Sequence, residues 1–545
     1  MNHMEGLGFT AHEQEVLLRA VKPDVISKMT AEHYYAALWI LRGRGNGALD
    51  SAAGSGKTWF GIKVAVPLIL ASGVQECAYA CFGKRNAEEL AEKLKADGLV
   101  GCAARTIHSL AFGAVKVRHS KGKMAMDREP TDGKYRQICK DLIADLASAG
   151  ASASLQELIE AGELDLLGPA EELCDLVRSQ LREPTDENLQ SMASWFGVVL
   201  PPGGEPEQIL FRLVRKVLEI GFNQIPVVWD FADLLWKCAK SNYRPKQFPW
   251  LVVDEYQDLS PAQLKVAELC MMRGARILFI GDPDQAIMGF AGADHRSCEA
   301  IVKKMECEVM GLSVCWRCPT SHLDLARQIV PKIQNAPGAI LGEIYRIAYE
   351  KLAEQVREGD MIICRVNADL ISLCFALIRA KVPARVIGRK IGEGLVAIAK
   401  QISKRKDFHG WEVFDKDVSA WIQRAVSSLL RKNGEDNKDP AIEMLRDKGE
   451  CLRIIWEMDN CRTLKQFEVS VNSLFSDDRP AVALSSIHRA KGLEADRVYI
   501  LREDLLPGPW AVPGTWQYKQ EENLHYVALT RAKQVMTFVA KPQKG

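Results

Sequence analysis

The chain of 545 residues carries 71 Lys and Arg against 70 Asp and Glu, so any surface for nucleic acid must be a local basic patch and not a property of the whole chain. At roughly 100–200 residues per domain this length predicts about three or four domains. The 47% content of hydrophobic residues is ample for packed cores.

The fifteen Cys are scattered along the chain, which predicts free and mostly buried thiols in a reducing compartment. Residues 1–10 lack the charged and then apolar build of a signal peptide. The apolar run at 64–71 is shorter than the roughly 18 residues of a membrane span. We therefore expect a soluble intracellular protein, cytoplasmic or associated with the nucleoid, without a membrane partner.

The first predicted element is a helix over residues 10–20, with Thr10 as its N-cap and Glu13 completing a capping box. The capping box is a sufficient reason for these residue types. Gln14 has a second interpretation, because a carboxamide can donate and accept together at the edge of an adenine base. The sequence leaves both interpretations open.

Residues 51–58 have the pattern of a phosphate-binding loop, fed by a short strand at 47–50 and followed by a helix at 59–71. Glycines let backbone N–H groups turn toward phosphate oxygens, and the helix N-terminus adds partial positive charge. The lysine would reach the β- and γ-phosphates, and the threonine hydroxyl would bind Mg²⁺. The full pattern has Gly in place of Ser51, and the alternative is a Gly-rich turn that happens to precede a Lys. The predicted nucleotide-binding residues here are Ala53, Gly54, Ser55, Gly56, Lys57 and Thr58.

Two further strands end in side chains that suit a nucleic acid backbone. A buried strand at 76–82 precedes a basic pair that begins at Lys84, and such a pair beside a helix start suits phosphates. An exposed turn with solvated charges explains the pair equally well. A strand at 101–105 precedes Thr106 and His108, which can donate to DNA phosphates, although a lone His is more often structural.

Residues 113–229 differ from the segments around them. They have helical periodicity and few strand signals, with a basic stretch at 115–126 and a break at 201–204. We interpret this segment as an inserted helical subdomain.

The apolar run at 250–253 predicts a strand covered on both faces, and it ends in Asp254 and Glu255. Such a strand suits a site that hydrolyses a nucleotide. Asp254 would hold Mg²⁺ through water, and Glu255 would orient and deprotonate the attacking water. The alternative is an acidic turn after a strand.

A further strand at 276–280 leads to Gln285, which could sense a γ-phosphate by hydrogen bonding. Phe290 follows five residues later and could stack on a base, an interaction that contributes about 1–3 kcal/mol and tolerates any sequence. A Phe in the core is the alternative.

The Cys-Trp-Arg-Cys sequence at 315–318 suggests a metal or redox site at first sight. A metal site needs a second ligand pair, and Cys298 and Cys307 are poorly spaced for that. Trp316 as a plate that stacks on adenine and Arg317 as a phosphate ligand explain the four residues better.

A second α/β region begins with a strand at 361–366, and strands at 481–485 and 497–501 continue it. Residues 396–477 between them are helical and charged. Arg531 lies near the C-terminus, and an Arg brought to a γ-phosphate across a domain interface would make catalysis depend on domain closure.

In this order the motifs resemble those of the UvrD/PcrA/Rep group of superfamily 1 helicases. Two stretches look closest to the F-box helicase branch, although no F-box is evident. They are Phe-Gly-Lys at 82–84 and Thr-Ile-His-Ser-Leu-Ala-Phe at 106–112. The matching blocks are Gly-Ser-Gly-Lys-Thr at 54–58, Thr-Ile-His-Ser at 106–109, Asp-Glu-Tyr-Gln-Asp at 254–258, Gly-Asp-Pro-Asp-Gln at 281–285, Trp-Arg at 316–317, His-Arg-Ala-Lys-Gly-Leu-Glu at 488–494 and Tyr-Val-Ala-Leu-Thr-Arg-Ala-Lys at 526–533.

The resemblance implies an α/β fold with two RecA-like P-loop NTPase domains, each with a parallel sheet and a mainly helical inserted subdomain. It implies ATP and Mg²⁺ between the domains, single-stranded DNA across both, and movement from 3′ to 5′. The implied roles are adenine contacts for Gln14 and Trp316, catalysis for Lys57, Thr58, Asp254 and Glu255, the γ-phosphate for Gln285, Arg317 and Arg531, the ribose for Glu494, and DNA for Lys84, Thr106, His108, Phe290 and His488.

The chain departs from the family pattern in four places. Gln14 lies farther before the phosphate loop than is usual, and Met288 and Ala291 replace the Tyr and Arg of the family. Cys315-Trp316-Arg317 stands where Asn-Tyr-Arg is usual, and the second insert is short. The predicted division is 1–112 and 230–310 for the first RecA-like domain, 113–229 for its insert, 311–395 and 478–545 for the second RecA-like domain, and 396–477 for its insert.

Two functions follow from these patterns. One is a DNA helicase and translocase that acts on single strands and duplex junctions. The other is a DNA-stimulated ATPase that remodels complexes as an accessory factor without processive unwinding, which the short second insert and the changes at 288 and 291 favour. An RNA-directed enzyme is a third and weaker alternative. A monomer is compatible with the sequence, and a need for an activating protein partner stays open.

Overall fold

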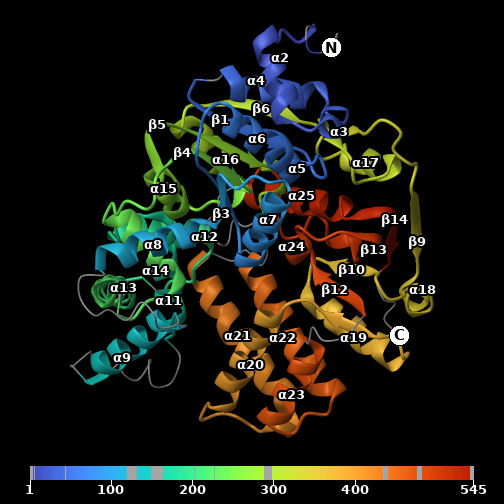
Figure 1. Ribbon diagram of the computed structural model, residues 1–545. Coiled ribbons are helices and arrows are strands. Elements are labelled where there is room, and N and C mark those ends of the chain that lie inside the picture. The colour runs from blue at the N-terminus through green and yellow to red at the C-terminus, as the bar shows by residue number, and fades with distance from the viewer. Residues whose placement is uncertain are drawn as a thin grey trace. The chain divides into compact units, whose positions relative to one another are not determined.

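The computed structural model divides the chain into two compact units, Met1–Ser313 and Val314–Gly545, each built around its own sheet (Figure 1). The residues that the structure describes are 4, 6–42, 44–119, 130–131, 133–148, 164–201, 203–225, 227–287, 297–433, 440–475 and 481–540.

The first unit contains a parallel sheet of six strands in the order β3-β2-β4-β5-β1-β6. This confirms the predicted α/β class. The strands are β1 (Asn46–Ser51), β2 (Cys77–Cys81), β3 (Cys102–Thr106), β4 (Phe248–Asp254), β5 (Met271–Gly281) and β6 (Cys307–Leu312).

Helices cover both faces of this sheet, because its central strands are apolar on both sides. In β4, Leu251 and Val253 belong to the apolar cluster of one face, and Trp250 and Val252 belong to that of the other. The helices are α2 (Ala11–Ala20), α3 (Pro23–Ile26), α4 (Ala31–Arg42), α5 (Lys57–Phe60), α6 (Val66–Ala71), α7 (Lys84–Ala96), α8 (Ile107–His119), α9 (Lys134–Ser148), α11 (Leu167–Gln180), α12 (Asp186–Phe196), α13 (Glu205–Gln224), α14 (Phe231–Lys240), α15 (Pro261–Leu269) and α16 (Ser297–Lys304).

Several element starts differ from the sequence prediction by one or more residues, among them those of β5 and α7. Strand β5 begins at Met271, five residues before the predicted start, because its exposed residues 272–274 hide the pattern of a buried strand. Helix α7 begins at Lys84, so the basic pair lies in the first helical turn and not in a turn before it.

The described residues between β3 and β4 are mainly helical and contain no strand. Helices α9, α11 and α13 pack on one another (Figure 1), and their apolar residues continue into the cluster on one face of the sheet. The residue boundaries of the six predicted parts stay a prediction, and α8 runs across the one placed between 112 and 113.

Arg276 of β5 links helix α4 to the sheet. Its guanidinium group lies between the rings of Trp39 and Trp250, 4.3 and 4.2 Å from their centres. It donates hydrogen bonds to the carbonyls of Trp39 (3.1 Å), Ile40 (2.9 Å) and Gly45 (3.1 Å). The first two carbonyls belong to the last turn of α4, where carbonyls lack helical partners and a cation is favourable.

We expect Arg276→Lys to destabilise the first unit by about 1–3 kcal/mol, because an ammonium group cannot stack and bind several carbonyls at once. Urea denaturation of the variant measures this loss. Arg273→Lys is the matched control, since Arg273 is exposed on the same strand. Equal stabilities of the two variants would contradict the role given to Arg276.

The second unit contains another parallel sheet of six strands, in the order β11-β12-β10-β13-β14-β9, and a small pair formed by β7 and β8. Its strands are β7 (Val314–Cys315), β8 (Gln334–Asn335), β9 (Glu343–Ile347), β10 (Met361–Cys364), β11 (Ala384–Val386), β12 (Val482–Ser486), β13 (Ala495–Leu501) and β14 (Ala532–Val539). Its helices are α17 (Thr320–Ala326), α18 (Leu352–Gln355), α19 (Asn367–Arg379), α20 (Arg389–Ser403), α21 (Phe414–Asn433), α22 (Pro440–Met458), α23 (Leu464–Leu474), α24 (Ile487–Ala490) and α25 (Trp516–Leu529).

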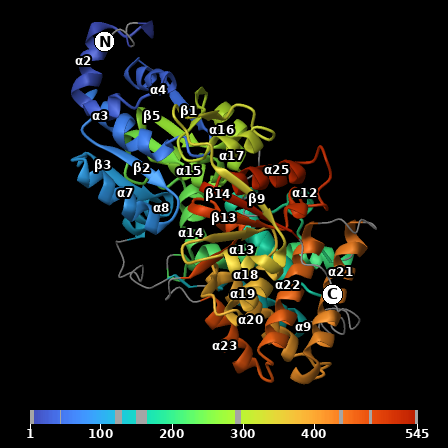
Figure 2. The ribbon, with the colours of Figure 1, turned by 90° about the vertical axis from the view of Figure 1, so that its right-hand side faces the viewer.

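Helices α20–α23 lie in the region predicted as the second insert. Helix α22 packs against α19, and α20, α21 and α23 pack on α22 (Figures 1 and 2). One apolar cluster joins them to the sheet, with Phe414, Leu452 and Phe467 from the insert and Ile362 and Tyr499 from the strands. The insert therefore shares its core with the sheet.

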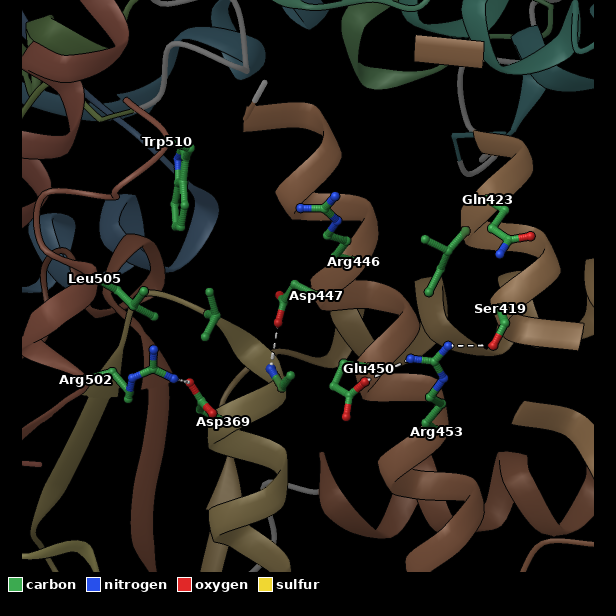
Figure 3. A pocket seen from close by; sticks show the side chains of 13 residues that line it. Asp369, Ser419, Gln423, Arg446, Asp447, Glu450, Arg453, Arg502, Leu505 and Trp510 are labelled. Carbon is green, nitrogen blue, oxygen red and sulfur yellow. Dashed lines mark hydrogen bonds and ion pairs between the residues drawn. The ribbon is translucent and has the colours of Figure 1, made fainter. Parts of the chain in front are cut away.

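A polar contact strengthens this junction. Asp447 of α22 accepts hydrogen bonds from the backbone N–H groups of Asn367 (3.1 Å) and Ala368 (2.8 Å), which begin α19. Beside it lies a pocket of about 610 Å³ between α19, α21, α22 and the segment 502–510 (Figure 3). Basic and acidic side chains both line this pocket, among them Arg446, Arg502, Asp369 and Glu450.

The fifteen cysteines are free thiols, and all are buried except Cys307, which is partly exposed, as the composition predicts. Among the helices that the structure describes, none combines the length and apolar character needed to cross a bilayer.

Candidate nucleotide site and nucleic-acid-facing residues

The loop between β1 and α5 has the backbone of a phosphate-binding loop. Gly54 and Gly56 have φ angles of +68° and +84°, a region that favours glycine. Helix α5 begins at Lys57, so its free N–H groups face the loop. Ser55 is buried, and its hydroxyl has no hydrogen-bond partner among the described residues. A phosphate oxygen would supply that partner.

Asp254 ends β4 and lies beside the loop. Its Oδ2 accepts hydrogen bonds from the Thr58 hydroxyl at 3.3 Å and from the Tyr79 hydroxyl at 3.1 Å. Burial, and then the neighbouring Glu255 carboxylate, raise the pKa of Asp254 to about 6, while Lys57 opposes that rise. A cation at this carboxylate would stabilise its charged form.

Thr58 and Asp254 fit Mg²⁺ that is bound together with nucleotide phosphates. Both side chains offer hard oxygen atoms, and Mg²⁺ is held in such sites by one or two protein ligands, phosphates and water. Within the described part of the chain, no group of three or more His, Cys, Asp and Glu side chains forms a metal site. The ion would therefore depend on the phosphates.

The hydroxyl group of Tyr79 orients Asp254 by donating a hydrogen bond to its carboxylate. Tyr79 is fully buried in β2, and its ring occupies the space where Gly61 has no side chain. A Cβ at Gly61 would lie 2.4 Å from the Tyr79 hydroxyl oxygen. Gly61 begins a short π-helical segment (Gly61–Ala65), a local widening often found near functional sites. Sequence patterns did not indicate Tyr79, because the contact joins two strands and a helix.

We expect Tyr79→Phe to weaken Mg²⁺ binding in the presence of nucleotide by about tenfold, because groups that orient a ligand tune metal affinity. Titration of Mg²⁺ against the binding of a fluorescent ATP analogue, and against ATPase rate, measures the change. Tyr345→Phe is the matched control, since that exposed hydroxyl also donates to a carboxylate, Glu343. An unchanged Mg²⁺ dependence would contradict the role of Tyr79.

A hydrogen-bonded chain links Glu255 to Gln285. Gln257 donates to a Glu255 carboxylate oxygen and accepts the backbone N–H of Asp282 at 3.0 Å. Gln285 donates to Asp282 Oδ2 at 2.7 Å. Side chains at the ends of β4 and β5 are thereby held in one network, which includes Gln257, a residue that the sequence did not indicate.

The structure shows the predicted capping box at the start of α2. The Thr10 hydroxyl accepts the Glu13 N–H, and the Glu13 carboxylate accepts the Thr10 N–H. Gln14 is partly buried and donates to the Phe9 carbonyl at 3.3 Å. Its role toward adenine stays a prediction.

The predicted DNA-binding residues of the first unit lie at strand ends. Lys84 is exposed, and Thr106 accepts the Ser109 N–H at 3.1 Å, which caps α8. His108 is partly buried, and burial lowers its pKa, so it is neutral at pH 7. Its ring meets the edge of exposed Phe231, 6.3 Å between centres, an aromatic residue that the sequence did not indicate. Phe290, with Met288 and Ala291, lies outside the described residues.

In the second unit, the arginines predicted to contact phosphate are held by local partners. Arg317 Nε is 2.6 Å from Glu494 Oε2, and Lys533 Nζ is 2.7 Å from the other oxygen of that carboxylate. Arg531 is buried and donates to the carbonyls of Val527 (2.9 Å) and Leu493 (3.2 Å).

The two remaining predicted residues of this unit differ in exposure. Trp316 is 47% exposed, which leaves its ring available for stacking. His488 is partly buried, and burial together with Arg365 lowers its pKa to about 3.

A glycine loop at the end of β1 and an acidic pair at the end of β4, on a parallel sheet, define a P-loop nucleoside triphosphatase. The family model described as "UvrD/REP helicase N-terminal domain" matches residues 40–306, and the "UvrD-like helicase C-terminal domain" matches residues 416–542. The chain belongs to the UvrD/REP helicase family.

Three relatives illustrate the range of similarity. ATP-dependent DNA helicase UvrD2 of Mycobacterium tuberculosis is 23% identical over 91% of this chain and 76% of its own length. DNA helicase II of Haemophilus influenzae is 20% identical over 56% of this chain and 58% of its own. F-box DNA helicase protein 1 of Schizosaccharomyces pombe is 25% identical over 59% of this chain and 37% of its own.

Proposed function

We propose that this protein is an ATP-dependent DNA helicase that moves 3′ to 5′ on single-stranded DNA and couples hydrolysis to duplex unwinding or protein displacement. The observation that carries the proposal is the contact of Thr58 with buried Asp254 beside the glycine loop. Membership of the UvrD/REP helicase family and the names of the DNA helicase relatives support the DNA substrate.

We assign the following roles in ATP hydrolysis to residues of this chain. Lys57 and the N–H groups of the loop bind the β- and γ-phosphates. Thr58 and Asp254 would hold Mg²⁺, which would supply positive charge against the phosphates. Glu255, oriented by Gln257, accepts a proton from the attacking water. Other proposed contacts are Gln285, Arg317 and Arg531 to the γ-phosphate, Gln14 and Trp316 to adenine, and Glu494 to the ribose.

The DNA would be bound through Lys84, Thr106, His108, Phe290 and His488. Because burial keeps His108 and His488 neutral, these two would contact DNA as uncharged donors or stacking partners. We propose an intracellular protein that acts on single strands and duplex junctions, as a monomer or with an activating partner.

A second candidate is an ATPase that remodels protein–DNA complexes without processive unwinding. The shared core of the short insert and the second sheet favours it, because an insert fixed to its sheet is a poor independent arm for a duplex.

The test measures ATP hydrolysis with and without single-stranded DNA, then strand displacement on 3′- and 5′-tailed duplexes. Stimulation with unwinding of the 3′-tailed duplex supports the helicase. Stimulation without unwinding supports the remodelling ATPase. Activation by RNA in place of DNA, or no activation, would overturn the proposal.

A further inference from the structure

Two cysteines lie close together in the loop that carries Trp316 and Arg317. Cys315 ends β7, and the backbone N–H of Cys318 donates to its sulfur at 3.4 Å. Both side chains are buried, at 0% and 3% exposure, whereas Trp316 between them is 47% exposed. The sequence argument against this pair was the lack of a second ligand pair, which a disulfide does not need.

The Cys318 thiol also contacts the segment that carries Arg531. Its sulfur is 3.6 Å from the carbonyl oxygen of Thr530, and Arg317 Nη1 is 3.5 Å from that oxygen. The Thr530 hydroxyl in turn accepts a hydrogen bond from Arg531 Nη2 at 3.0 Å. A change at Cys318 would therefore affect Arg317 and Arg531, because all three side chains contact Thr530.

Cys315 differs chemically from other thiols of the chain, whereas its neighbour Cys318 has a raised pKa as they do. Burial raises the pKa of Cys81 to about 11 and those of Cys238 and Cys270 to about 12. The Cys318 thiol, helped by backbone N–H groups and Arg317, instead lowers the pKa of Cys315 to about 7. The thiolate is the form that attacks an oxidant or a disulfide.

We propose that Cys315 and Cys318 form a reversible oxidation site, which a peroxide converts to a disulfide and which slows nucleotide hydrolysis when oxidised. The Cys315 sulfur attacks one peroxide oxygen and becomes a sulfenic acid, releasing one water. The Cys318 sulfur then attacks the Cys315 sulfur and displaces the second water. The two thiols lose two electrons and two protons, hydrogen peroxide gains both, and a dithiol reductant reverses the reaction.

The expected consequence follows from the contacts that the disulfide replaces. A disulfide brings the sulfurs to about 2.05 Å and consumes the S–H that Thr530 accepts. The closed ring holds Trp316 and Arg317 in a new backbone conformation. This effect on hydrolysis rests on the function proposed above. The burial of both sulfurs restricts the oxidant to a small molecule. Among the described residues, no third ligand converts the pair into a metal site.

The chemical part of the test does not depend on ATPase activity. The full-length protein is treated with hydrogen peroxide, remaining thiols are alkylated, and tryptic peptides are analysed by mass spectrometry. Trypsin cuts after Arg317, so peptides 305–317 and 318–327 stay joined only by a disulfide. We expect the joined pair, linked at Cys315 and not at Cys307, and its loss with dithiothreitol. Absence of this link at peroxide levels that oxidise other thiols would overturn the proposal.

The functional part compares ATPase rates before and after peroxide, each relative to the same variant in the reduced state. We expect a fall of about tenfold or more for the natural protein, since an arginine at the γ-phosphate contributes 10³–10⁵ to the rate, and recovery with dithiothreitol. Cys315→Ser and Cys318→Ala should each resist. Cys77→Ala is the matched control, because Cys77 and Cys102 are a second pair of neighbouring cysteines, opposite each other on β2 and β3, and it should stay sensitive.

The outcomes separate the two proposals. A disulfide without a change in rate, or equal sensitivity of Cys318→Ala, would overturn the oxidation site as a control of hydrolysis. A reduced protein without DNA-stimulated ATPase would contradict the proposed function, while the peptide result would still report on the disulfide.

Discussion

Glu255→Gln is expected to lower DNA-stimulated ATP hydrolysis by about 10²–10⁴-fold, the usual contribution of a general base. The amide keeps the size of the side chain and can still accept the hydrogen bond from Gln257, but it cannot take a proton from water. Binding of a fluorescent ATP analogue should be retained. Single-turnover hydrolysis and equilibrium nucleotide binding, measured on the same sample, separate the two effects.

Glu219→Gln is the matched control for this prediction, because Glu219 is exposed on α13 and forms a surface ion pair with Lys216. Its ATPase rate should equal that of the natural protein. Lys57→Ala should lose nucleotide binding as well as hydrolysis, because it removes the phosphate contact. Survival of DNA-stimulated ATPase in the Lys57→Ala, Glu255→Gln double variant would show that the site is assigned wrongly.

Asp233→Asn is expected to destabilise the first unit by about 3–5 kcal/mol, the cost of breaking a buried ion pair from one side. Asp233 on α14 is fully buried and contacts Lys134 at 2.6 Å, Arg178 at 3.1 Å and the Tyr135 hydroxyl at 2.6 Å. The substitution leaves two buried cations with reduced compensation. Urea denaturation followed by far-ultraviolet circular dichroism measures the loss.

Asp186→Asn provides the contrast for Asp233. It removes the same charge from an exposed pair with Arg215, 2.6 Å apart, where a salt bridge contributes only about 0.2–1 kcal/mol. If both variants lost similar stability, the cluster around Asp233 would not be the anchor that joins α9 and α11 to α14.

Local patterns indicated much of the fold because short-range forces decide it. Alternation and apolar runs identified five strands of the first sheet, and the capping box of Thr10 and Glu13 is present as predicted. The exposed start of β5 was missed, since Arg273 and Gly274 interrupt the apolar pattern of the strand. Periodicity predicted the helical character of the described parts of 113–229 and 396–477, but it did not predict the packing of α22 on α19 through Asp447.

The candidate site likewise contains residues that the sequence predicted and residues that only the structure identified. Lys57 and Thr58 were predicted because loop, lysine and threonine are contiguous in the sequence. Tyr79, Gln257 and Phe231 were not predicted. Tyr79 and Gln257 bind partners that are distant in sequence, and the exposure of Phe231 is visible only in the folded protein. The pairing of Arg317 with Glu494 joins two motifs that the sequence treats separately.

The sequence by itself determined the phosphate loop, the acidic pair after β4 and the family, because these depend on contiguous residues whose spacing sets the local backbone. Only the tertiary structure decided that Tyr79 fills the space at Gly61 to reach Asp254, and that the Cys318 thiol meets the carbonyl before Arg531. Such contacts arise when buried polar groups find partners as distant segments pack, and no local pattern encodes which partner that packing brings within reach.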